Sequence, residues 1–185
     1  MRQLALIFSL VFSVQVFGLS NEVALGILRQ STAERLSSGQ RTSPRPGYGL
    51  GFKTESYSYE NFYLKLGLIY EQRTVNDLFS GIEHNFDLKT LDLMTHIAYR
   101  INDSFSIFAG PDYSILLSSS CRAVVGPCLI SEDAKKYFVP VEAGFDFTYL
   151  ERYGAEIFFE SISQEIWEKT FQNSQTYGLN LKYKF

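Results

Sequence analysis

The chain has 185 residues, of which 45% are hydrophobic, 20% charged and 16% aromatic, and its mean hydropathy is −0.06. These values fit one folded domain and exclude a disordered, collagen-like or disulfide-dense chain. With 17 basic and 20 acidic side chains the formal charge is −3, which argues against a general nucleic-acid binder because such proteins carry a basic excess.

The first residues have the pattern of a secretory signal peptide. Arg2 supplies a positive charge, residues 4–12 form an apolar core, and Val16 and Gly18 occupy the positions that precede a cleavage site. The apolar run is too short for a membrane helix, which needs roughly 20 residues. We expect residues 1–18 to be removed, with cleavage between 18 and 20, and residues 19–185 to form a single domain.

The remaining chain alternates between apolar and polar side chains with a period of two, which is typical of β-strands. Leu64 and Leu66, for example, alternate with Lys65 and Gly67. Long polar connections are expected at 31–45, 74–86, 118–136 and 163–174, and short turns between the other strands. The pattern predicts eight strands at 23–30, 46–56, 62–73, 91–100, 105–117, 139–149, 155–160 and 177–185.

The two faces of these strands differ in chemistry. One is apolar and almost free of charge, whereas the other is rich in glycine and in acids and bases. Tyr and Phe gather at both strand ends, as they do at two membrane interfaces. Because a sheet in lipid must close to pair every amide, the sequence predicts an all-β, eight-stranded antiparallel up-and-down transmembrane β-barrel with short periplasmic turns and long extracellular loops.

The interior of such a barrel is only wide enough to be filled by side chains. Buried charges must pair, so the charged face predicts an internal network of ion pairs and hydrogen bonds. Glu55 and Lys184 are also expected to face the interior. The predicted lumen network comprises Lys53, Lys65, Glu71, Arg73, Asp92, His96, Arg100, Asp112, Glu142, Asp146, Glu156, Glu160 and Lys182.

Two of the long connections carry features of their own. Cys121 and Cys128 bracket a short loop and are expected to form a disulfide, because an exported protein reaches an oxidising compartment. Zinc is disfavoured, because no His or further Cys lies near them at metal-ligand spacing. This loop exposes two valines and is either a recognition tip or a protection against proteases. The first long loop is basic, and either contacts lipopolysaccharide phosphates or is an ordinary solvated loop; its arginines are Arg29, Arg35, Arg41 and Arg45.

The C-terminal segment 177–185 ends in Phe185, with Tyr183 and other apolar residues at alternate preceding positions. It resembles the C-terminal signature of bacterial outer-membrane barrels. The segments 91–100 and 105–117, with Gly110-Pro111, resemble the middle hairpin of the small outer-membrane β-barrel family that includes the OmpA and OmpX barrels. The resemblance implies location in the outer membrane of a diderm bacterium. It also implies that the barrel-assembly machinery reads Tyr183 and Phe185.

We therefore expect an integral outer-membrane barrel with a filled lumen, acting in envelope integrity or, through its loops, in surface interaction. Outer-membrane lipid and lipopolysaccharide are the expected partners, together with an unknown surface partner. The protein is expected to be a monomer without cofactor, metal or nucleic acid. A narrow pore is disfavoured by the crowded interior.

Two alternatives remain open. The first is a lipid A-modifying barrel enzyme, but the His-x-Ser pairing of barrel deacylases is absent, so we predict no catalytic residue. His84 is assigned to a solvated loop and His96 to the lumen beside Asp92, where a pairing with Ser106 or Ser114 is conceivable. The second is a soluble lipocalin-like carrier, which would need an apolar interior and a Gly-x-Trp motif that this sequence lacks.

Overall fold

The computed structural model describes residues 20–79, 81–128, 134–167 and 170–185, and the predicted leader 1–18 lies outside them. All the named secondary-structure elements of these described residues are β-strands. The described residues contain no helix long and apolar enough to cross a membrane. The strands are β1 (Ser20–Arg35), β2 (Ser43–Tyr59), β3 (Phe62–Phe79), β4 (Ile82–Asn102), β5 (Phe105–Ala123), β6 (Tyr137–Phe138), β7 (Val141–Tyr149), β8 (Tyr153–Ile162) and β9 (Phe171–Lys184).

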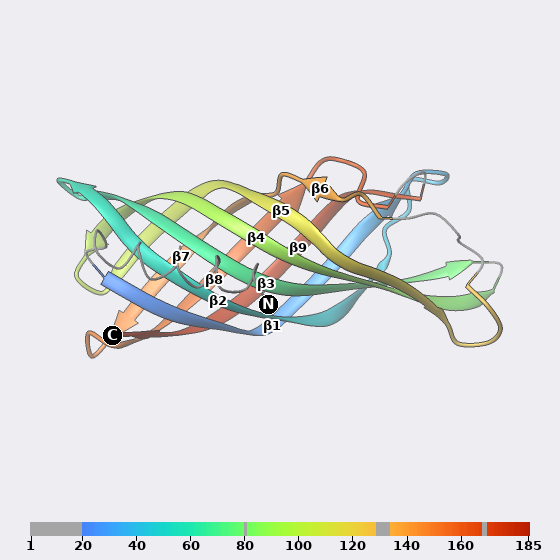
Figure 1. The fold of residues 1–185 in the computed structure, drawn as a ribbon, viewed down its shortest axis with the longest axis horizontal. Coiled ribbons are helices and arrows are strands. Elements are labelled where there is room, and N and C mark those ends of the chain that lie inside the picture. Colours follow the sequence, from blue (N-terminus) through green and yellow to red (C-terminus); the bar gives the residue numbers. More distant parts are fainter. Residues whose placement is uncertain (1–19, 80, 129–133, 168–169) are drawn as a thin grey trace, which may run out of the picture.

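The long strands form a closed antiparallel barrel (Figure 1). Each strand from β1 to β5 pairs with the next, β5 pairs with β7, and β7, β8 and β9 follow in order. The ring closes where β9 pairs with β1. Apart from the two-residue β6, the sheet therefore has the eight strands that the sequence predicts, and the up-and-down barrel is confirmed.

Strand β6 is a detached continuation of β7 in the same register. Phe138 lies opposite Ser114 and Val141 lies opposite Pro111, and between them the Asp112 N–H donates to the Pro140 carbonyl (3.0 Å). Pro140 has no N–H of its own, so the ladder is interrupted at this residue. The predicted strand at 139–149 therefore begins at Val141.

Side chains alternate between the interior and the exterior of the barrel. In β4, every second residue from His84 to Ala98 is buried and the residues between them are partly or fully exposed. The exterior carries an apolar band flanked by aromatic side chains, as predicted. Its exposed members include Val23, Leu25, Leu50, Leu93, Ile107, Phe145, Ile157 and Leu181 in the band, and Tyr48, Tyr59, Phe62, Tyr113, Tyr149, Tyr153, Tyr177 and Tyr183 toward the two ends.

The four neighbouring strands from β2, with 17 residues, to β5 are well over the length that a membrane requires. β3, β4 and β5 have 18, 21 and 19 residues, whereas β7 and β8 have 9 and 10. A transmembrane strand needs about 9 to 11 residues. The excess continues beyond the barrel as a three-stranded sheet, on the right of Figure 1. We call this part, residues 74–86 together with 118–123, the extension.

The extension corrects the predicted loops. Most of 74–86 and the first part of 118–136 are strand, and β1 and β2 also reach into the predicted loop 31–45. The β3–β4 register is continuous up to the turn, where Gly81 adopts a φ of +79°. Beyond the apolar band the outward side chains, such as Thr74, Asn85 and Asp87, are polar, so the outward apolar face that identifies a membrane strand in sequence is missing there.

We predict that Ile157→Arg destabilises the barrel and that Leu78→Arg does not. Ile157 is 61% exposed and lies opposite Phe145, the middle residue of β7, whereas Leu78 is 59% exposed but lies on the extension. A basic side chain at the bilayer midplane costs about 2–4 kcal/mol. Urea unfolding of both variants in lipid vesicles measures the difference, and an equal loss in free energy of unfolding would contradict lipid contact of the band.

Candidate functional site in the barrel interior

Charged side chains from all eight long strands converge in the interior. Of the predicted lumen residues, all but Arg100 are buried. Two buried charges were not predicted, Glu22 and Arg29, each 1% exposed. Glu22 points to the same face of β1 as the buried Ala24 and lies one residue before the predicted start of that strand. A predicted start one residue earlier would have placed Glu22 among the interior side chains.

Arg29 faces the interior because β1 contains a bulge. The register shifts between Gly26 and Arg29, so Ile27 is exposed while Arg29, two residues later, is buried. A bulge adds one residue to one strand and reverses the parity that follows. Gly26 and Gly49 leave the space that the guanidinium occupies, since a Cβ at either would lie 2.7 Å from Arg29 Nε. The assignment of Arg29 to an anion-contacting loop is therefore wrong.

Two of the other arginines assigned to that loop are paired with the extension. Arg35 donates to both carboxylate oxygens of Asp77, at 2.8 and 2.6 Å, and Arg45 forms an ion pair with Glu83. Both acids lie close to the turn of the β3–β4 hairpin, so these pairs tie β1 and β2 to its tip. Arg41 is exposed.

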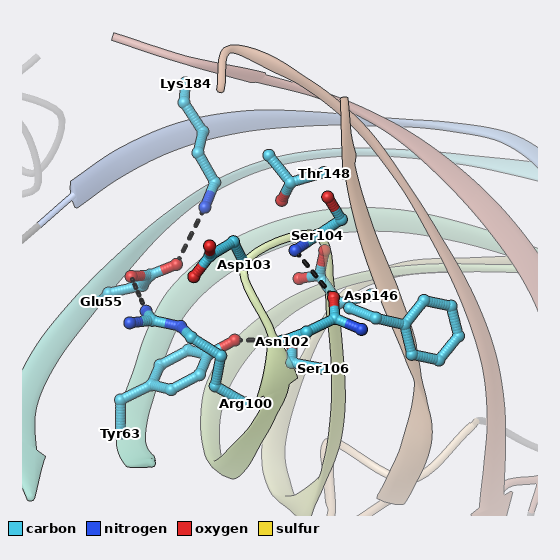
Figure 2. Close-up of a pocket in the computed structure, with 11 residues that line it drawn as sticks. Glu55, Tyr63, Arg100, Asn102, Asp103, Ser104, Ser106, Asp146, Thr148 and Lys184 are labelled. Atoms are coloured by element: carbon cyan, nitrogen blue, oxygen red, sulfur yellow. Dashed lines mark hydrogen bonds and ion pairs between the residues drawn. The ribbon is translucent and has the colours of Figure 1, made fainter. Parts of the chain in front are cut away.

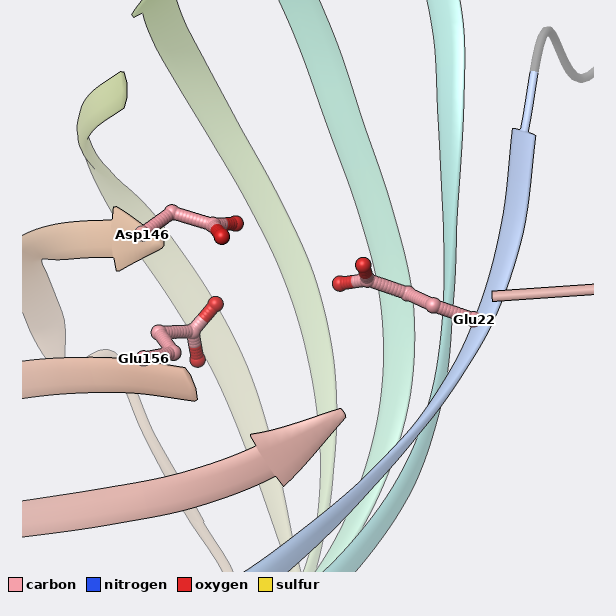
Figure 3. A group of neighbouring side chains, drawn as sticks. All are labelled: Glu22, Asp146 and Glu156. Carbon is pink, nitrogen blue, oxygen red and sulfur yellow. The ribbon is translucent and has the colours of Figure 1, made fainter. Parts of the chain in front are cut away.

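The half of the interior nearer the short turns contains three lysines and three carboxylates, the lysine cluster. Lys65 lies 2.7 Å from Asp146 and 2.9 Å from Glu156, and Lys182 lies 3.1 Å from Glu22. Lys53 forms an ion pair with Glu156. Figure 3 shows the three carboxylates pointing toward one another from opposite walls. Because three ammonium groups lie among them, the cluster is neutral overall.

A second group, the arginine cluster, consists of Arg29 and Arg73 with Glu71, Asp92 and Glu160. It lies farther from the short turns than the lysine cluster does. Arg73 contacts all three acids, at 2.8 Å from Glu71, 3.1 Å from Asp92 and 2.6 Å from Glu160. Arg29 pairs with Glu71 and stacks on the Phe158 ring at 4.5 Å. Two guanidinium groups thus serve three carboxylates.

His96 lies beside Asp112, and not beside Asp92 as predicted. Its Nε2 is 2.9 Å from Asp112 Oδ1 and its Nδ1 is 4.0 Å from Glu142 Oε1, while Asp92 is engaged by Arg73. The ring stacks on Phe108 at a centroid distance of 5.2 Å. Gly110 allows this position, because a Cβ there would lie 2.9 Å from the His96 ring.

The conceivable pairing of His96 with a serine nucleophile is not formed. Neither ring nitrogen of His96 has a hydrogen-bond partner, and the Ser106 hydroxyl bonds to the Tyr63 hydroxyl at 2.8 Å. His96 and Ser114 are also fully buried, whereas a lipid A substrate would approach from outside the barrel wall.

Arg100 lies at the short-turn mouth of the barrel. Its side chain is 46% exposed and pairs with Glu55 at 3.4 Å, and Lys184 reaches the same carboxylate at 3.0 Å. Figure 2 shows these groups lining a polar pocket with Tyr63 and Asp103. The prediction that Arg100 belongs to the buried lumen is therefore wrong, because its position lies beyond the last full layer of interior side chains.

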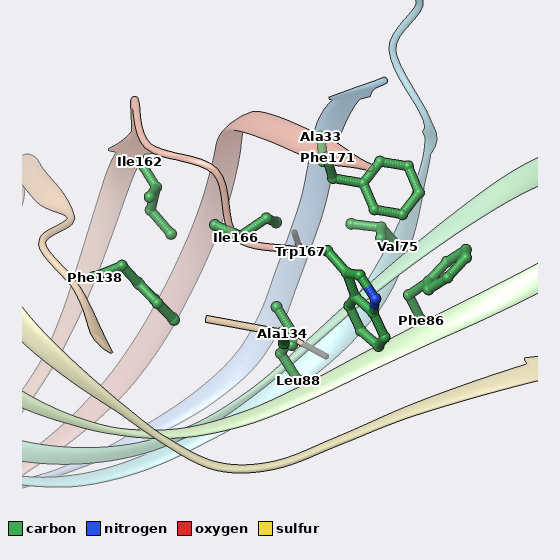
Figure 4. Packing of buried hydrophobic residues seen from close by; sticks show 10 residues of the cluster. All are labelled: Ala33, Val75, Phe86, Leu88, Ala134, Phe138, Ile162, Ile166, Trp167 and Phe171. Atoms are coloured by element: carbon green, nitrogen blue, oxygen red, sulfur yellow. The ribbon is translucent and has the colours of Figure 1, made fainter. Parts of the chain in front are cut away.

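An apolar cluster covers the opposite mouth (Figure 4). Ile166, Trp167 and Phe171 are at most 3% exposed, although the sequence assigns 163–174 to a polar loop. Trp167 and Phe171 both meet Phe86 edge-on, at 5.1 and 4.8 Å between ring centroids. The cluster comprises Ala33, Val75, Phe86, Leu88, Ala134, Phe138, Ile162, Ile166, Trp167 and Phe171.

His84 belongs to the wall beside this cluster. The sequence assigns it to a solvated loop, but the side chain is fully buried in β4, its Nδ1 is 2.8 Å from the Ile82 carbonyl, and its ring stacks on Phe86. That assignment is wrong because His84 lies in β4, whereas the sequence pattern places it in a loop at 74–86.

Cys121 and Cys128 lie at disulfide-bonding distance, with Cα atoms 6.0 Å apart. Cys121 is in β5, and the pair closes the turn that follows the extension. Val124 and Val125, between the cysteines, are 63% and 69% exposed, as predicted.

Comparison with known proteins gives the fold. No family model matches the sequence, and no curated protein matches it. Ail of Yersinia pestis, solved in complex with the heparin analogue sucrose octasulfate, aligns with a TM-score of 0.54 and 17% identity over 90% of this chain and 98% of that chain. Neisserial surface protein A aligns with a TM-score of 0.58 and 12% identity over 90% and 97%.

Both neighbours are small eight-stranded barrels of the bacterial outer membrane. The chain has the fold of the small outer-membrane β-barrels. Its closed strands, outward apolar band and charged interior are those of this architecture.

We predict that Lys65→Met greatly destabilises this outer-membrane barrel and that Arg45→Met does not. The Lys65 ammonium is buried among three carboxylates, so its removal leaves uncompensated charge and costs about 3–5 kcal/mol. The Arg45–Glu83 pair is partly exposed and contributes about 0–1 kcal/mol. Unfolding in urea, followed by the heat-dependent gel mobility of the barrel, compares the two. Similar midpoints for both variants would contradict a buried lysine cluster.

Proposed function

We propose that the barrel acts in surface interaction, with the extension as its binding element outside the cell. The observation that carries this proposal is the length of β3, β4 and β5, which continue as paired strands well past the membrane. Paired strands hold their exposed side chains in fixed positions, which reduces the entropy lost when a partner binds. The Arg35–Asp77 and Arg45–Glu83 pairs support this rigidity, because they hold the tip of the extension against β1 and β2.

The closed interior supports an anchoring role for the barrel rather than passage of solutes. Ion-paired side chains fill the middle of the lumen, and the apolar cluster around Trp167 covers the mouth beneath the extension. A solute would have to displace both buried ion pairs and tightly packed rings. In this proposal the barrel holds the extension at the surface.

Lipopolysaccharide remains a proposed partner of the barrel wall rather than of the first loop. A sulfated ligand is bound to Ail. In this chain Arg29 is buried and Arg35 and Arg45 are paired, which leaves Arg41 from that set for an anion. Exposed Lys136 lies 5.4 Å from the Tyr137 ring at the outer aromatic girdle, where headgroup phosphates are expected.

Recognition by the barrel-assembly machinery is supported by the end of the chain at β9. Tyr183 and Phe185 are 40% and 61% exposed on the outer surface, and β9 forms the closing seam with β1. The barrel-assembly machinery would therefore find both aromatic rings accessible before β9 pairs with β1.

We predict that removing the tip of the extension abolishes cell attachment and leaves the barrel intact. Asn76 and Asn85 lie opposite each other, so replacing residues 77–84 with Asn-Gly closes a short hairpin between them. The shortened protein should retain its heat-dependent gel mobility, and its cells should attach to one another and to surfaces as poorly as cells without the gene.

The controls separate the two proposed roles. If the extension is the binding element, detergent tolerance of the shortened strain equals that of the wild type. Wild-type attachment by the shortened strain would contradict the proposal, and so would equal attachment by wild-type cells and cells without the gene.

A further inference from the structure

The buried charges of the lumen are balanced in one place and unbalanced in another. The lysine cluster has three bases for three acids, and the arginine cluster has two for three. Asp112 and Glu142, which are 4% and 1% exposed, form no ion pair with any lysine or arginine among the described residues. Two carboxylates in the middle of the barrel thus lack a compensating side-chain cation.

These two acids converge with a third on one point. Oxygens of Asp112, Glu142 and Glu160 all lie within 4.8 Å of one another. They come from β5, β7 and β8, so the barrel wall fixes their relative positions. Arg73 holds Glu160 at 2.6 Å and so orients its carboxylate from the side of the arginine cluster.

His96 adds a nitrogen donor that nothing else uses. The side chain is fully buried, its Nε2 lies 2.9 Å from Asp112 Oδ1, and neither ring nitrogen makes a hydrogen bond. Asp112 Oδ1 and Glu142 Oε1 are likewise buried without a hydrogen-bond partner. Buried polar atoms are rarely left unsatisfied, because each costs the free energy of its lost hydration.

We propose that Asp112, Glu142 and Glu160 bind one divalent transition-metal ion of the zinc class inside the barrel, with His96, whose Nε2 lies 2.9 Å from Asp112 Oδ1, as the nitrogen donor on the Asp112 side. Carboxylate oxygens with an imidazole nitrogen are a donor set that Zn²⁺ accepts. One such ion neutralises the charges of Asp112 and Glu142 and provides a partner for their orphaned oxygens. In the other two groups every acid is already paired with a lysine or arginine, whereas in this group only Glu160 is.

The position of His96 is itself set by β5. Phe108 stacks on one face of the ring with an interplanar angle of 10°, and Gly110 admits the ring on the neighbouring strand. The ring therefore has a fixed orientation without any hydrogen bond, which suits a ligand whose bond is made to an ion. A metal here would join β4 to β5, β7 and β8.

The test is metal loading of the whole mature barrel. The protein is unfolded in urea with a chelator, freed of the chelator, and refolded into detergent with Zn²⁺ alone, so that burial does not block entry. After desalting, the zinc content is measured by mass spectrometry, and folding by heat-dependent gel mobility. We expect one Zn²⁺ per chain and a higher melting temperature than in the metal-free barrel.

Two variants locate the ion. Asp112→Asn with Glu142→Gln removes both uncompensated charges and should fold but lose the zinc, whereas Glu22→Gln removes an equally buried acid from the lysine cluster and should keep it. A folded wild type that retains less than a tenth of an equivalent overturns the proposal, as expected if protons alone neutralise the two acids. Zinc that persists in the double variant overturns it as well. If the double variant fails to fold, His96→Phe is the substitute and carries the same expectations.

Discussion

The pairing of every backbone amide within lipid is the constraint on which the rest of this structure depends. An open sheet would leave N–H and C=O groups of β1 and β9 unpaired in hydrocarbon, so the strands close and β9 joins β1. Closure with eight strands sets a narrow interior. Because successive side chains point to opposite faces, each residue placed outward in lipid commits its neighbour to that interior.

The charged interior follows from this geometry, and so does its arrangement in groups. Charges inside a narrow barrel cannot be solvated, so each acid needs a cation within a few ångströms. Lys65 and Arg73 each reach three acids from one wall, which allows single bases to connect strands far apart in the chain. Where no base reaches, at Asp112 and Glu142, the same constraint asks for another source of positive charge.

The parts that sequence alone predicts are those in which one face meets lipid. Alternation identified the inward side chains of β3, β7 and β8, including Lys65, Glu142 and Glu156, because there the outward face is uniformly apolar. Arg29 was misassigned because a bulge reverses parity without any mark in the local pattern. His84 was misassigned because its strand lies beyond the apolar band. The packing of Trp167 on Phe86 joins residues distant in sequence, and no local pattern encodes such a contact.

The two ends of the barrel are built for different surroundings. At the short-turn end the lumen opens into a polar pocket around Glu55, where Arg100 and Lys184 remain partly hydrated. At the other end apolar rings cover the lumen, and they pack against β3 and β4 just where these strands leave the membrane. The apolar cluster therefore has two effects: it excludes water from the buried ion pairs, and it packs against the base of the extension. A rigid element beyond the membrane and a sealed lumen within it thus depend on the same packed residues.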